Sequence, residues 1–182
     1  PWELPPVEPG DRLVDVAFIG SLHRPGTWGH RHRDRFIARV LGLAPEGIRV
    51  YVQDHVTYLE VQEIYARSQI VVDYATEGPW LTPRTIDALN AGALVLAPAP
   101  TDELHLGSHD WLEDRRHLVY FADADEAIEL IRYYLAHPEE AREIAQAGQE
   151  LVRSLAGRWA RELGSLLVDG CFRQVPQDFL ER

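Results

Sequence analysis

At 182 residues, with 46% hydrophobic and 26% charged residues, the chain has the size and composition of a soluble globular domain with one full core. Its formal net charge of -11 argues against a general nucleic-acid or anionic-membrane surface, because those partners require a broad positive field. No apolar run is long enough to cross a bilayer and no signal peptide is visible, so we expect a cytoplasmic protein.

Every cationic side chain besides histidine is arginine, since the sequence contains no lysine. This absence excludes Walker-type phosphate loops and Schiff-base enzymes, which both require a lysine. Methionine is also absent, an initiator included, so we expect the chain to be a piece of a longer protein.

Strands and helices alternate along the sequence. After a proline-rich linker over residues 1–13, the predicted strands cover residues 14–19, 48–52, 69–75, 93–97 and 118–121, and the predicted helices cover residues 31–43, 58–67, 83–91, 124–136, 139–155 and 158–168. Segments of this kind imply right-handed βαβ crossovers. We therefore predict an α/β fold with a doubly wound, Rossmann-like parallel sheet over residues 14–170, followed by a tail over residues 171–182.

The stretch from Asp73 to Pro98 is the part of the sequence on which our functional interpretation depends. Its loop carries Glu77, and Thr82 followed by Pro83 is typical of a helix N-cap and first helical residue. A helix that begins there directs free backbone N–H groups at the mouth of the sheet, which favours an anion. Gly92 is the expected end of this helix.

Ligands of doubly wound sheets bind beyond the carboxyl ends of the strands. Two loops with polar groups fit this position, at residues 20–24 and 77–84. The segment from His23 to Arg35 is densely basic and holds three histidines. It lacks the spacing of a metal site, and we interpret it as a loop over the ligand.

Three stretches carry a resemblance to a known family: Phe18 to Ser21, Pro83 to Gly92, and Tyr133 to Gly148. They resemble the C-terminal, nucleotide-sugar-binding half of glycosyltransferases with two facing Rossmann-like domains, the GT-B fold. Within these the chain is most similar to group 1 transferases related to spore-coat maturation protein B. The resemblance spans roughly residues 14–167.

The resemblance implies a role for several residues. An acidic residue five positions before the glycine holds the donor ribose in that family, usually as Glu, and Asp87 stands there. An earlier acid normally precedes it by eight residues; position 79 is proline, so Glu77 is the nearest substitute. With no lysine to hold the diphosphate, Arg84 and Arg24 are the available cations. The turn at Gly20 and Ser21 would approach the phosphates closely.

The resemblance thus implies an enzyme that binds a nucleotide-diphosphate sugar without a metal or other cofactor. Its acceptor would bind an N-terminal domain of the same polypeptide, and the isolated chain would bind donor without transferring sugar. Asp123 and Asp125 match the Asp-x-Asp metal pattern of another transferase class, but a helix cap explains them better.

Two alternatives stay open. A degenerate, non-catalytic domain used for protein interaction would fit the proline at position 79 and the missing lysine. A dinucleotide-dependent oxidoreductase fits less well, because the loop from Gly20 to Gly26 lacks the Gly-x-Gly-x-x-Gly spacing.

Overall fold

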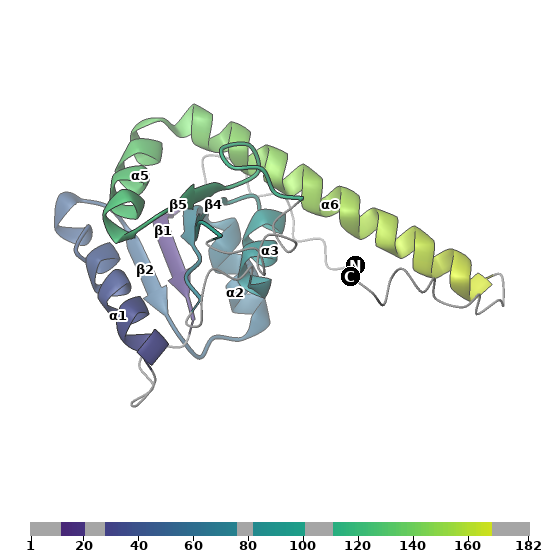
Figure 1. Cartoon of the computed structure of the whole chain (residues 1–182), viewed down its shortest axis with the longest axis horizontal. Coiled ribbons are helices and arrows are strands. Elements are labelled where there is room, and N and C mark those ends of the chain that lie inside the picture. The colour runs from purple at the N-terminus through teal and green to yellow at the C-terminus, as the bar shows by residue number, and fades with distance from the viewer. Residues whose placement is uncertain (1–11, 21–27, 76–81, 101–110, 169–182) are drawn as a thin grey trace.

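The computed structural model describes residues 12–20, 28–75, 82–100 and 111–168, and the side chains of all of these except 28–31 and 157–168. Five parallel strands form one sheet in the order β2-β1-β3-β4-β5 (Figure 1). They are β1 (Val14–Ile19), β2 (Val50–Gln53), β3 (Ser68–Val72), β4 (Leu94–Pro98) and β5 (Val119–Phe121). The predicted α/β class and parallel sheet are confirmed. The predicted linker and tail lie outside the described residues, apart from positions 12 and 13.

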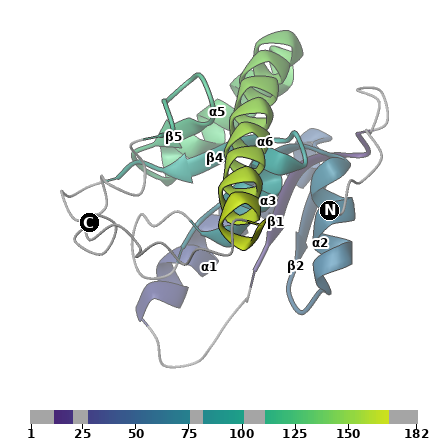
Figure 2. The same cartoon turned by 90° about the vertical axis from the view of Figure 1, so that its right-hand side faces the viewer.

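Helices cover both faces of the sheet (Figures 1 and 2). They are α1 (Trp28–Leu41), α2 (Tyr58–Ala66), α3 (Pro83–Asn90), α5 (Ala124–Ala136) and α6 (Pro138–Val168), with a short 3-10 helix η1 (Ala44–Glu46). The core has two apolar clusters, one on each face. Helices α1 and α5 pack with Val16 and Phe18 of β1, while α2 and α3 pack with Ala17 and Ile19. Successive β1 residues point to opposite faces, as in any strand that is buried on both sides.

Helix α6 is continuous, so the predicted break between residues 155 and 158 is wrong. It contributes Ile144 and Ala145 to the α1 and α5 side of the core and Val152 to the α2 and α3 side. Figure 1 shows its C-terminal part extending past the sheet. No strong helix breaker separates the two predicted segments, because Gly157 costs only about 1 kcal/mol relative to alanine.

A close approach at Gly148 lets α6 pack against α3 and the segment that precedes β5. A β-carbon at this position would lie 2.7 Å from Leu89 Cδ2 and closer still to the His117 carbonyl oxygen. The next residue is Gln149, whose Nε2 donates to the Asn90 carbonyl at 2.8 Å and fixes the end of α3. Gly92 follows that end with a φ of +76°, as its predicted role in ending the helix requires.

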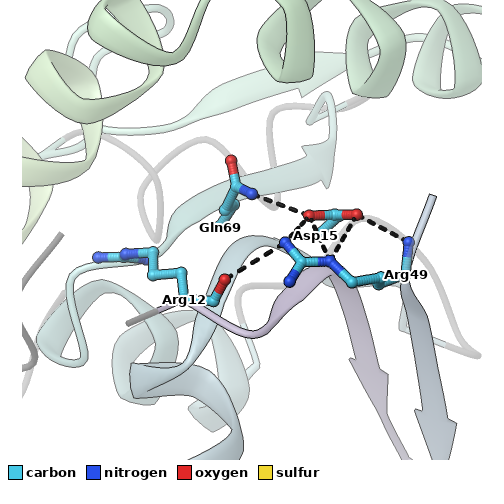
Figure 3. Close-up of polar contacts among 4 residues, drawn as sticks. All are labelled: Arg12, Asp15, Arg49 and Gln69. Carbon is cyan, nitrogen blue, oxygen red and sulfur yellow. Dashed lines mark hydrogen bonds and ion pairs between the residues drawn. The ribbon is translucent and has the colours of Figure 1, made fainter. Parts of the chain in front are cut away.

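At the amino ends of the strands, a polar cluster ties three strand starts together (Figure 3). Asp15 accepts hydrogen bonds from the Arg49 backbone N–H at 2.7 Å, from Arg49 Nη2 at 2.5 Å and from Gln69 Nε2 at 2.9 Å. Burial alone would raise the pKa of Asp15, but the bonds from Arg49 outweigh burial and lower it. The Arg12 side chain points away and donates to the carbonyls of Ser68 and Gly92.

We predict that Gly148→Ala destabilises the fold by about 1–3 kcal/mol, because the added methyl group would force α6 away from Leu89 and His117. Urea unfolding followed by circular dichroism measures this. Ser154→Ala, on an exposed position of α6, is the control. An equal effect of the two substitutions would contradict the close packing.

We predict that Asp15→Asn lowers the free energy of unfolding at pH 7 by about 1 kcal/mol. Because the pKa of Asp15 is depressed in the folded state, its contribution is complete above the unfolded value of 3.8 and disappears as the pH falls through the folded value. The difference between wild type and variant, measured by urea unfolding across this range, should therefore shrink in acid. Glu143→Gln, exposed on α6, should show no such pH-dependent difference.

Candidate functional site

The candidate site lies where the order of the strands reverses. Strands β2 and β3 flank β1 on opposite sides, so the crossovers after β1 and β2 run over opposite faces of the sheet. A crevice opens at such a switch point, beyond the carboxyl ends of the strands. Gly20 follows β1 there, and Asp73 follows β3.

The buried carboxylate of Asp73 connects this edge to the start of α3. It accepts hydrogen bonds from Thr82 Oγ1 at 2.6 Å and Thr85 Oγ1 at 2.5 Å, and Arg84 Nε lies 3.3 Å away. Thr82 is the predicted N-cap: its side chain accepts from the Arg84 backbone N–H at 3.2 Å, and Pro83 is the first helical residue. The Asp73 carboxylate therefore holds the start and the first turn of α3 in place.

Arg84 lies at the loop after β1, as the sequence argument requires. A β-carbon built on Gly20 would be 3.6 Å from Arg84 Nη1 and 3.1 Å from Phe18 Cζ. A side chain at Gly20 would therefore crowd the Phe18 ring, and its β-carbon would be in van der Waals contact with the guanidinium. The Arg84 side chain is 29% exposed, so it can reach a ligand while Asp73 holds it.

A second arginine, which we did not predict from the sequence, lies near Arg84 and Asp73. Arg33, on α1, is only 3% exposed, and its guanidinium carbon lies 6.0 Å from the centre of the Phe18 ring. Burial lowers the pKa of Arg33, and the nearby charge of Arg84 lowers it further against the opposing charges of Asp34 and Asp73. Arg33 and Arg84 thus place two guanidinium groups close enough to influence each other, with Asp34 and Asp73 as the opposing charges.

A sequence signal for Arg33 existed. It shares the helical stripe of Phe36, Ile37 and Val40, all buried, and an arginine on such a stripe needs a reason. The interpretation of residues 23–35 as a loop is wrong from Trp28 onward, because α1 begins there, three residues before the predicted start of this helix at residue 31.

Asp87 lies half-buried on α3, facing α2. The Tyr58 hydroxyl donates to its Oδ1 at 3.2 Å. Burial raises the pKa of Asp87, against the lowering effect of the Tyr58 hydroxyl and the Gln62 amide. Among the described residues, Arg84 pairs with Asp73 and Asp87 accepts from Tyr58, and no Arg84–Asp87 ion pair forms although the two residues lie three apart on α3.

Three predicted site residues, Ser21, Arg24 and Glu77, lie outside the described residues. Asp123 is a helix cap: its Oδ1 accepts from the backbone N–H groups of Asp125 and Glu126 at 2.8 and 2.9 Å. Glu126 Oε2 accepts a hydrogen bond from the Ala122 backbone N–H at 2.6 Å, in place of the Asp123 N–H that a capping box would use. Across residues 12–20, 28–75, 82–100 and 111–168, no three His, Cys, Asp or Glu side chains are grouped to hold a metal ion.

The sequence profile of the family described as Glycosyl transferase-like matches residues 7–163. The chain belongs to this family. Among curated protein sequences, none matches it. The predicted resemblance to glycosyltransferases is confirmed at the level of family and fold.

Solved structures show the same fold at low sequence identity. HepE of Anabaena, solved in complex with UDP-glucose, superposes with a TM-score of 0.54 at 15% identity, covering 86% of this chain and 50% of HepE. Sucrose-phosphate synthase of Thermosynechococcus elongatus gives 0.54 at 19% identity, with 82% and 38% covered. The C-terminal domain of the group 1 glycosyl transferase LpcC of Francisella tularensis gives 0.53 at 15%, with 77% and 85% covered.

This transferase-like chain thus has the GT-B C-terminal domain fold and spans half the length of HepE. In the part of the chain that the structure describes, no helix combines the length and apolar character needed to cross a membrane.

We predict that Asp73→Asn destabilises the protein by about 3 kcal/mol, because it removes the buried carboxylate that pairs with Arg84 and accepts hydrogen bonds from Thr82 and Thr85. Thermal and urea unfolding measure the loss. Asp125→Asn is the matched control, since Asp125 pairs with Arg39 while its side chain is 77% exposed. A loss no larger than that of the control would contradict the role of Asp73.

Proposed function

We propose that this domain binds the nucleotide-diphosphate-sugar donor of a glycosyltransferase. The observation that carries the proposal is that Arg84 and Asp87 lie on the first two turns of one helix, with Arg84 held against Gly20 at the switch point of the sheet. A cation and a hydrogen-bond acceptor thereby lie about one turn apart on the same helix, as a diphosphate and a ribose require.

The diphosphate would lie against Gly20 and the start of α3. Arg84 and the N–H groups of the first turn would bind its oxygens, and buried Arg33 would add to the positive field. Ser21 and Arg24 would extend this contact. As the glycosidic bond forms, negative charge grows on the leaving nucleotide, and fixed cations stabilise it. We infer that this charge stabilisation needs no metal.

Asp87 would accept hydrogen bonds from the ribose, and Glu77 would lie near the sugar. HepE, which has this fold, has been solved with UDP-glucose, and this supports a nucleotide-sugar ligand here. Because the chain spans half of HepE, we place the acceptor site in an N-terminal domain of the same polypeptide. We expect a cytoplasmic enzyme.

Isothermal titration calorimetry of the 182-residue chain with a panel of nucleotide-diphosphate sugars, UDP-glucose included, tests the proposal. We expect at least one donor to bind, equally well with and without EDTA. Arg84→Ala and Asp87→Ala should each weaken binding by about ten-fold or more. The isolated chain should not transfer the sugar.

Arg132→Ala is the control, because Arg132 pairs with Glu46 on the opposite face of the sheet. Thermal unfolding of each variant separates loss of binding from loss of fold. If no donor binds, or if the two site variants bind as the control does, the domain is better explained as a non-catalytic interaction module.

A further inference from the structure

Tyr58 is a large aromatic residue that is exposed at the start of a helix. It is the first residue of α2, and its side chain is 60% exposed. The backbone around it is fixed: the Thr57 N–H donates to Glu60 Oε2 at 2.7 Å, and the Glu60 N–H donates to Thr57 Oγ1 at 3.4 Å. This capping box holds the main chain in place while the ring stays at the surface.

The Tyr58 ring reaches across to α3. Its hydroxyl donates to Asp87 Oδ1, the carboxylate that we assign to the donor ribose. One turn further along α2, on the same face, Gln62 places its amide beside the same carboxylate. Asp87 is thus approached by one exposed donor and one buried donor.

Gln62 is incompletely satisfied. The residue is 6% exposed, and its Nε2 is buried without a hydrogen bond of normal geometry to any described residue. A buried amide N–H without an acceptor is costly, so sites of this kind call for a ligand or a function. The missing group is an acceptor that can sit next to a carboxylate.

A vicinal diol supplies what Asp87 and Gln62 lack. Each hydroxyl both donates and accepts a hydrogen bond. One hydroxyl can donate to the carboxylate, while either hydroxyl accepts from the amide. The Tyr58 hydroxyl occupies the carboxylate, and the Gln62 amide, although it lies beside Asp87, has no acceptor in normal hydrogen-bond geometry.

We propose that Asp87 and Gln62 together form the binding site for the ribose diol, and that Tyr58 covers this site with its hydroxyl in the place of a ribose hydroxyl. This inference rests on the proposed donor-binding function. The exposed Tyr58 ring turns out toward solvent when the nucleotide enters, and the ribose then completes the hydrogen bonds of both buried groups.

Calorimetry of the 182-residue chain with UDP, ADP, GDP and CDP, each compared with its 2′-deoxy counterpart, tests the inference. We expect the wild type to prefer a ribonucleotide. Tyr58→Phe removes the competing hydroxyl but keeps the ring, so it should tighten ribonucleotide binding by about two- to five-fold, the scale of a weak solvent-exposed hydrogen bond.

Gln62→Leu keeps the volume of the side chain and removes the amide. It should bring the ratio of ribonucleotide to deoxyribonucleotide affinity close to one, while Arg84 still holds the diphosphate. Tyr133→Phe is the control for the first variant, since Tyr133 is also exposed and donates to a carboxylate, that of Glu140, at 2.8 Å. Gln146→Leu, exposed on α6, is the control for the second.

The outcomes separate the two proposals. If a nucleotide binds through Arg84 and Asp87, but Tyr58→Phe leaves its affinity unchanged or weaker, then Tyr58 is not a competing occupant. An unchanged preference for ribose in Gln62→Leu would likewise overturn the diol site and leave donor binding intact. Failure of all eight nucleotides to bind wild type or Tyr58→Phe would overturn both proposals.

Discussion

The candidate site depends on the buried carboxylate of Asp73. It stands at the carboxyl end of a central strand and accepts hydrogen bonds from both threonines that flank Arg84 in the sequence. A buried carboxylate is tolerated only when it is paired and hydrogen-bonded. Here the pairing holds Arg84 beside Gly20, the residue that follows β1. The fold and the charge of the site are therefore linked through a single residue.

The sequence predicted the fold well, because its physical signals are local and strong. Apolar runs marked all five strands, and alternation with helices implied the parallel arrangement. The N-caps at Thr82 and Asp123 were also predicted, since a side-chain oxygen that accepts from N–H groups two or three residues away needs no tertiary information. Predicting a break in α6 failed, because a single glycine costs too little to interrupt a helix.

The site was only half predictable. Sequence reasoning selected Arg84 and Asp87 and placed Arg84 near Gly20, which the structure shows. It missed Asp73, Arg33, Tyr58 and Gln62, whose importance comes from contacts between distant elements. Asp73 and Arg33 lie 40 residues apart in the sequence, yet the charges of both lie close to the guanidinium of Arg84. Neither periodicity nor a short motif predicts a contact between such distant residues. The position of Arg33 on an apolar helical stripe did indicate that it has a specific role.

The polar cluster of Asp15, Arg49 and Gln69 lies at the amino edge of the sheet, opposite the candidate site. Each edge contains charged groups, but the polar cluster and the candidate site have no residue in common. Substitutions in the loops beyond the carboxyl ends therefore leave the bonds that tie the strand starts together untouched. Related proteins with this architecture can change the ligand that they recognise through those loops while they keep the same scaffold. The separation of the scaffold bonds from the ligand-binding loops helps to explain how a common fold persists at sequence identities near 15%.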